Sequence, residues 1–277
     1  MTKTILDRRI GREVESFNDF VFERFGLDFS NYRASALKRR LQIRMNALGI
    51  DSIPLYIEYL KSTNGEIAHL LDTITIHVTE FFRDRSVFEY MNDKIMPEII
   101  GNKSRRFDTC LRIWSAGCSS GEETYSLAII AFDSIERLGS DLRLRIYGTD
   151  ISRKACKRAK AGAYPAAKLA NVPKRMIHRY FDESDGEYVV KESLKRRVEI
   201  VAHDLVMDDP FKEIDLVFCR NVFIHFNAIV RNKVLEKFAE ALKPGGFLVL
   251  GKSEAITGSM RRYFELVSAR NKVYRKR

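Results

Sequence analysis

The sequence contains no long apolar run. Hydrophobic residues make up 45% of the 277 residues, but the first fifteen, MTKTILDRRIGREVE, already carry a charge every few positions. A bilayer-spanning helix needs about 20 apolar residues, and a signal peptide needs an apolar stretch of about 7 to 15. We therefore expect a cytoplasmic protein that has no signal peptide and is not a membrane protein.

Cysteine is also scarce. The four cysteines are Cys110, Cys118, Cys156 and Cys219, and no two of them form a C-x-x-C pair. No histidine stands near them at the spacing of a zinc site. We expect reduced, mostly buried thiols and no metal.

Acidic residues are too few to balance the basic ones. The chain has 48 Lys and Arg against 37 Asp and Glu, a formal net charge of +11. Such an excess predicts attraction to nucleic acid, to a membrane surface or to an acidic protein, and charge alone does not choose among them.

Residues 31–45, NYRASALKRRLQIRM, hold five of these cations. Apolar residues recur there at helical spacing and are expected to face a core: Leu37, Leu41, Met45 and Leu48. The adjacent face is either a solvated helix surface or a docking surface for an acidic partner. The docking residues would be Arg33, Lys38, Arg40 and Arg44. No arginine-glycine repeat or aromatic platform accompanies them, so nucleic acid is not the expected partner.

The hydrophobic pattern changes along the chain. Residues 1 to about 78 show helical patterns only, whereas from about Arg112 short apolar runs alternate with amphipathic segments. We therefore expect a helical domain at 1–85 and a second domain at 86–277. The second pattern predicts an α/β domain with a parallel sheet and crossover helices. The last residues, FELVSARNKVYRKR, predict an antiparallel edge. A polar turn followed by EYVV and RRVEIV predicts a β-ribbon inserted at about 180–201.

One glycine-rich loop, Gly117-Cys118-Ser119-Ser120-Gly121, matches two kinds of site. It fits the G-x-S-x-G elbow of hydrolases, in which an acid and then a histidine follow the serine in the chain. Asp215 and His225 are in that order, but they would lie on one strand and the loop directly after it, and no H-G-G-G oxyanion loop is present.

The same loop also matches a cofactor cradle. The strand LRIWSAG precedes it, a helix begins near Glu122, and the next strand ends in Asp150, where a carboxylate can bind ribose hydroxyls. Glu122 and Glu123 would repel a pyrophosphate and suit a ligand with an ammonium group, such as S-adenosylmethionine. A simple tight turn is the remaining alternative.

Five motifs in order resemble the chemotaxis receptor methyltransferase (CheR) family over roughly residues 15–275. They are VTEFFRD (78–84), WSAGCSSGEETYSLAI (114–129), YGTDIS (147–152), FCRNVFIHF (218–226) and LKPGGFLVLGKSE (242–254). The resemblance implies a Rossmann-like class I methyltransferase sheet that is parallel with an antiparallel edge. It also implies a small all-helical N-terminal domain and a short β-ribbon.

The resemblance further implies the roles of individual residues. Thr79, Arg83, Ala116, Gly117 and Glu122 would contact the methionine end of S-adenosylmethionine. Asp150 would bind its ribose, and Asp204 and Leu205 would flank its adenine. Arg220 and Asn221 would lie beside the transferred methyl group. Structural alternatives remain for three of them: Thr79 as a helix cap, Arg83 as an ion-pair partner of Asp84 or Glu80, and Asp204 as a turn cap.

Two histidines depart from the family pattern. His225 replaces the usual tyrosine of the F-C-R-N-V-x-I-Y-F block at the methyl-transfer site, and His77 replaces an asparagine that contacts the cofactor. We keep His225 as a candidate catalytic residue together with Arg220, and His77 as a candidate cofactor contact.

The implied function is methylation of glutamate side chains on the acidic cytoplasmic helices of chemoreceptors. A glutamate carboxylate is already ionised near pH 7, so the reaction needs no general base. Some members of the family hold a receptor tether peptide with a longer ribbon loop, so by this resemblance the short DESDGE turn implies an enzyme that does not need the tether. We also expect a monomer. Two alternatives remain: a scaffold of the same fold that binds S-adenosylmethionine with weakened turnover, and a methyltransferase for another acceptor.

Overall fold

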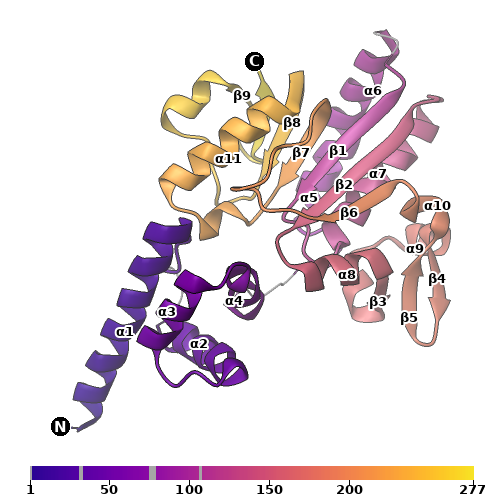
Figure 1. Ribbon diagram of the computed structural model, residues 1–277. Helices are drawn as coiled ribbons and strands as arrows, with labels where there is room; N and C mark the ends of the chain where they lie inside the picture. Colours follow the sequence, from indigo (N-terminus) through magenta and orange to yellow (C-terminus); the bar gives the residue numbers. More distant parts are fainter. Residues whose placement is uncertain (1, 31–33, 75–78, 106–107) are drawn as a thin grey trace. The chain divides into compact units, whose positions relative to one another are not determined.

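The computed structural model describes residues 2–30, 34–74, 79–105 and 108–277. The chain forms two compact units (Figure 1). One comprises residues 1–76 and 223–232, and the other comprises residues 77–222 and 233–277. The first unit ends before the expected boundary at residue 85 and includes a short segment from far along the chain.

Four helices build the N-terminal part of the first unit: α1 (Thr2–Phe25), α2 (Ala34–Leu48), α3 (Ile53–Ser62) and α4 (Glu66–Ile74). The expected apolar face of α2 is present, since Leu37, Leu41 and Met45 are buried and Leu48 is partly buried. Helical spacing alone was enough to identify this face.

A buried ion pair joins α2 to α4. Arg44 donates to both carboxylate oxygens of Glu66, at 2.7 and 2.6 Å, and the Tyr56 hydroxyl donates to the same carboxylate at 2.7 Å. Burial alone would raise the pKa of Glu66, but the hydrogen bonds from Arg44 and Tyr56 outweigh it and hold the pKa below its usual value. The Arg44 guanidinium therefore has its binding partner within this unit.

We expect Arg44→Met to destabilise the helical unit by about 2 to 3 kcal/mol, because it leaves the buried Glu66 without its cation. The loss stays below that for a fully buried pair, since 19% of the Arg44 side chain is exposed. This loss of stability is measured by hydrogen exchange of the α2 and α4 amides. The matched control is Lys61→Met, which removes an exposed pair with Glu58 and should change stability by less than about 1 kcal/mol. Equal effects would contradict a structural role for Arg44.

A seven-stranded sheet forms the centre of the second unit (Figure 1), in the order β6-β2-β1-β7-β8-β10-β9. The strands are β1 (Cys110–Ala116), β2 (Arg143–Asp150), β6 (Val198–Ala202), β7 (Ile214–Cys219), β8 (Leu242–Leu250), β9 (Phe264–Ser268) and β10 (Val273–Lys276). The pairs among β6, β2, β1, β7 and β8 are parallel, and β10 pairs antiparallel with β8 and β9. The expected Rossmann-like sheet with an antiparallel edge is confirmed.

Helices cover both faces of this sheet. The helices of this unit are α5 (Arg85–Tyr90), the π-helix η1 (Met91–Ile95), α6 (Met96–Arg105), α7 (Glu122–Arg137), α8 (Arg153–Ala161), α9 (Lys174–Tyr180), α10 (Glu192–Lys195) and most of α11 (Ala228–Ala241), with short 3-10 turns η2 (Ala166–Leu169) and η4 (Gly258–Arg262). The 3-10 turn η3 (Phe223–His225) and the start of α11 belong to the first unit. Ile113 joins a core with Leu127 of α7, whereas the next residue, Trp114, packs edge-on against Phe238 of α11 at 5.2 Å. This alternation is typical of a strand buried on both faces. None of the described helices is both long and apolar enough to cross a bilayer.

The inserted ribbon is a three-stranded antiparallel sheet in the order β3-β5-β4, with β3 (Ala163–Pro165), β4 (Phe181–Ser184) and β5 (Glu187–Val190). The expectation of a ribbon is confirmed, but its expected end at residue 201 is wrong. Residues 198–201 lie in β6, which pairs in parallel with β2 in the large sheet. Burial explains the difference, since Ile200 packs on Cys156 and Ala159 of α8 in a small apolar cluster beside the large sheet.

Candidate functional site

The glycine-rich loop joins the carboxyl end of β1 to α7, and its shape depends on both glycines. Gly117 and Gly121 have φ of +80° and +96°. A Cβ on Gly117 would lie 2.4 Å from Val222 Cγ2, and one on Gly121 would lie 2.9 Å from Ala159 Cβ. Positive φ and close packing together require glycine at both positions. Gly117 follows the buried Ala116, and its N–H donates to the Thr149 carbonyl at 2.8 Å.

Asp150 ends β2 directly across from this loop. One carboxylate oxygen accepts from the Ser119 N–H at 2.8 Å, and the other accepts from the Ser152 N–H at 2.9 Å. Each carboxylate oxygen can accept more than one hydrogen bond. Asp150 therefore fixes the loop and places its carboxylate at the carboxyl end of β2.

The two adjacent glutamates at the start of α7 have different surroundings. Glu122 is fully buried, accepts from the Ser120 hydroxyl at 2.8 Å and lies 3.1 Å from Lys168 Nζ. Lys168 also donates to the Thr79 carbonyl at 2.5 Å. Glu122 thus has an internal cation, although it was the glutamate expected to bind a ligand ammonium.

Glu123 lies with the charged groups at the carboxyl ends of the strands. Its carboxylate accepts from the Ser115 hydroxyl of β1 at 3.0 Å. Burial raises the pKa of Glu123 to about 7, an effect that the nearby Arg220 and Arg83 oppose and Glu254 reinforces. A carboxylate held there in a low dielectric favours a cationic ligand. The sequence pattern predicts the ammonium contact at Glu122 and not at its neighbour Glu123, and that contact stays a prediction.

Arg220 follows β7 and is almost completely buried, with 1% of its side chain exposed. It donates to the Arg83 carbonyl at 3.0 Å and to the Asp84 carboxylate, which also pairs with Lys252 at 2.5 Å. Burial would raise the pKa of Asp84, but Lys252 and Arg220 lower it below its usual value. Asp84 therefore pairs with both Arg220 and Lys252.

Asn221 has a left-handed backbone, with φ of +60°. Its N–H donates to Glu254 at 3.1 Å, and the same carboxylate accepts from the Gly251 N–H at 2.6 Å. Glu254 is buried and ties the turn after β7 to the turn after β8. Glu254 is the last residue of the motif LKPGGFLVLGKSE, and the motif alone predicts no role for it.

Asp204 and Leu205 follow β6. The Asp204 carboxylate accepts from the N–H groups of Val206 and Met207, at 2.8 and 3.2 Å, so it caps its own turn. Leu205 is buried. Asp204 therefore acts as a turn cap in this structure, and its contact with the adenine of the cofactor stays a prediction.

His225 belongs to the first unit. Its carbonyl accepts from the Asp28 N–H at 2.9 Å, and the neighbouring Phe226 forms an antiparallel bridge with Leu27. His77 and Arg33 lie outside the described residues, so their predicted contacts remain predictions.

The other expected docking cations have internal partners. Lys38 lies 3.9 Å from Glu13, Arg40 donates to the Thr73 carbonyl at 2.7 Å, and Arg44 pairs with Glu66. These interactions correct the expectation that Arg40 and Arg44 are available for an acidic partner.

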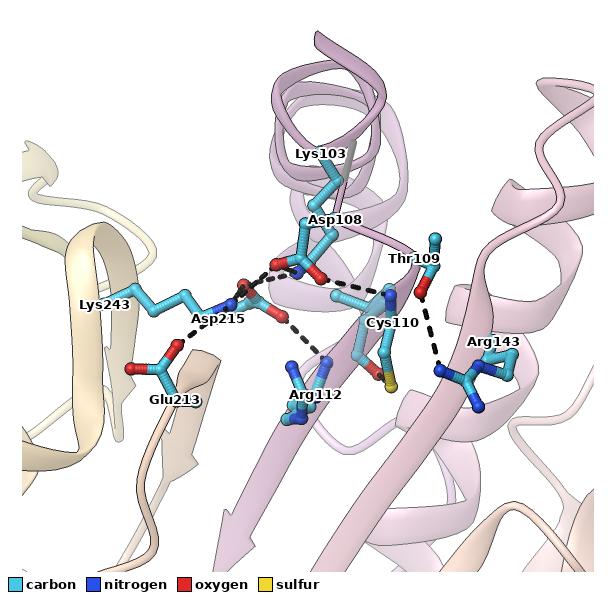
Figure 2. A network of polar contacts seen from close by, with 10 residues as sticks. Lys103, Asp108, Thr109, Cys110, Arg112, Arg143, Glu213, Asp215 and Lys243 are labelled. Carbon is cyan, nitrogen blue, oxygen red and sulfur yellow. Dashed lines mark hydrogen bonds and ion pairs between the residues drawn. The ribbon is translucent and has the colours of Figure 1, made fainter. Parts of the chain in front are cut away.

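The hydrolase interpretation is wrong, because Asp215 and Ser119 lie at opposite ends of the parallel strands. Asp215 starts β7 and accepts from the Arg112 N–H at 2.8 Å. Figure 2 shows it in a network with Lys103, at 2.9 Å, and Lys243. Burial raises the pKa of Asp215 in spite of these partners. Ser119 follows the opposite end of β1, so the two cannot form a triad.

No group of histidine, cysteine, aspartate or glutamate side chains within the described ranges has the arrangement of a metal site. The free cysteines at 110, 118, 156 and 219 are all buried.

Two family models match the chain. Residues 77–273 match "CheR methyltransferase, SAM binding domain", and residues 3–75 match "CheR methyltransferase, all-alpha domain". The chain is 34% identical over 253 residues to a chemotaxis protein methyltransferase of Borreliella burgdorferi, covering 89% of both chains. It is 35% identical over 255 residues to chemotaxis protein methyltransferase 1 of Pseudomonas aeruginosa, covering 88% of this chain and 90% of that one. A 104.1 kDa protein of Rhodobacter capsulatus is 32% identical over 248 residues, 90% of this chain, and the match spans 26% of that longer protein.

Proposed function

Because the chain belongs to the CheR methyltransferase family, we propose that it transfers the methyl group of S-adenosylmethionine to glutamate side chains on the cytoplasmic helices of chemoreceptors. The products are glutamate methyl esters, formed in chemosensory adaptation. The structural observation that supports this most strongly is the cluster of Glu123, Arg220 and Arg83 beside the glycine-rich loop.

The residues present fit S-adenosylmethionine. Glu123 is assigned to its ammonium group, Asp150 to its ribose hydroxyls, and Arg83 to its carboxylate. The raised pKa of Glu123 marks a carboxylate that a ligand cation would stabilise in its charged form. Gly117 keeps the backbone free of a Cβ at the loop. Thr79, Ala116, Leu205 and Asn221 remain predicted contacts.

When bound, S-adenosylmethionine supplies a methyl carbon that is activated by attachment to a sulfonium. The acceptor carboxylate is ionised at neutral pH, so this chain need only orient the two partners and exclude water from the carboxylate. We assign Arg220 a positioning role in place of the expected catalytic role beside the transferred methyl group. Its guanidinium is buried and donates to Arg83 and Asp84, so it holds the segment that follows Thr79 and keeps positive charge near Glu123.

The proposal is tested with methyl-labelled S-adenosylmethionine and membranes that contain chemoreceptors. We expect label on the receptor that is released as methanol by mild alkali, because a carboxyl ester is base-labile. Cofactor binding without receptor label would support a scaffold with weakened turnover. Alkali-stable label, or label in RNA, would indicate another acceptor.

A further inference from the structure

Much of the excess positive charge lies in one segment that the proposed site does not use. Residues 151–181 contain nine Lys and Arg and no Asp or Glu. Five of these cations lie on α8 and are exposed: Arg153, Lys154, Lys157, Arg158 and Lys160. We call these five residues the α8 basic face.

The α8 basic face lies along one side of a helix that is capped at both ends. Helical geometry places its five residues on one side of α8, opposite Ala155, Cys156 and Ala159, which are buried. The Ser152 hydroxyl accepts from the Ala155 N–H at 3.0 Å and caps the first turn, and Gly162 ends the helix in a left-handed conformation.

These cations have no carboxylate partner among the residues that the structure describes, in contrast to Arg44 and Arg220. Like charges four residues apart destabilise a helix, as do cations in its first turn, where Arg153 and Lys154 lie. The α8 basic face is therefore arranged for an anionic partner outside the chain.

We propose that the α8 basic face binds an acidic α-helical segment of the receptor substrate, an inference that rests on the proposed function. Carboxylates three or four residues apart on a partner helix repeat with the same spacing as Arg153 and Lys157, or Lys154 and Arg158. A lipid surface fits less well, because interfacial helices carry large apolar side chains and the exposed side of α8 has none. The first turn also adjoins the site, since Ser152 donates its N–H to Asp150.

The test compares two triple variants with the same net charge. The α8 variant is Lys154→Gln, Lys157→Gln and Arg158→Gln. The control is Lys233→Gln, Arg261→Gln and Arg270→Gln, which removes three exposed cations elsewhere on the second unit. We expect the α8 variant to raise the KM for receptor about tenfold at low salt and to leave kcat within about twofold, with a weaker salt dependence. The affinity for S-adenosylhomocysteine should stay unchanged.

Equal KM values in the two variants would overturn the proposal, as would weaker S-adenosylhomocysteine binding by the α8 variant alone. Vesicles of phosphatidylserine and phosphatidylcholine, and a single-stranded RNA, test the other anionic partners. Loss of binding to either, with receptor KM unchanged, would also overturn it. An alanine-based helical peptide with glutamate at every fourth position tests the docking surface separately from receptor methylation. If the wild-type protein binds this peptide through α8 but does not methylate receptor, the proposed docking surface is supported and the proposed function is contradicted.

Discussion

Replacing Arg220 with methionine is expected to reduce kcat for receptor methylation by about 100-fold or more, the scale on which a pre-organised charged donor contributes at an active site. Arg220 holds the Arg83 carbonyl and the Asp84 carboxylate. It also lowers the pKa of Glu123, so without it Glu123 would be largely protonated at neutral pH. Steady-state kinetics with membrane receptor measures the loss.

Two further variants separate positioning from general instability. Arg220→Lys keeps the charge but cannot reproduce both hydrogen bonds, so we expect partial recovery of kcat. Arg85→Met removes an exposed pair with Glu89 and should leave kcat unchanged. If Arg220→Met unfolds at the same denaturant concentration as wild type and keeps full kcat, the positioning role is excluded.

The second large effect concerns the two adjacent glutamates. Glu123→Gln should weaken binding of S-adenosylhomocysteine by about 10- to 100-fold, the value of one charge-assisted hydrogen bond. Glu122→Gln should instead lower thermal stability, because it breaks the buried contact with Lys168, and should change affinity much less. Isothermal titration calorimetry of both variants measures the affinity for S-adenosylhomocysteine, and thermal unfolding measures the stability. The reverse pattern would return the ammonium contact to Glu122.

The assignment of Glu123 also has a pH signature. Since its pKa is raised to about 7, and a ligand ammonium binds the ionised carboxylate, affinity should increase as pH rises from about 6 to 8. Binding near pH 6 should release a proton, which calorimetry detects in buffers of different ionisation enthalpy. In Glu123→Gln the affinity should be flat over this range. A pH-dependent affinity in that variant would assign the titration to another group.

The fold could be predicted to the level of its sheet. Alternating apolar runs and amphipathic segments indicated the parallel strands, and the final two runs indicated the antiparallel edge, because both signals are local. The extent of the ribbon was less predictable. Val198 and Ile200 suit either sheet, and only their packing on α8 and pairing with β2 decides it.

The site was predictable as a set of segments and less so as individual side chains. The loop at 117–121 and Asp150 are adjacent in the structure, as the strand-loop-helix pattern indicates. By contrast, the separate environments of Glu122 and Glu123 depend on Lys168, Ser115 and Arg220, which lie on other elements. The prediction that Arg44 lies on a docking surface was wrong for the same reason, since its partner Glu66 lies on a different helix.

The central claim is tested most directly by finding the methylated atom. Receptor is incubated with the wild-type protein and S-adenosylmethionine, digested under mildly acidic conditions that preserve esters, and mapped by tandem mass spectrometry. We predict methyl groups on glutamate side chains of the receptor's cytoplasmic helices, and strongly reduced modification with Arg220→Met. Methyl groups on lysine, arginine or cysteine, or an unmodified receptor in the presence of bound cofactor, would contradict the account.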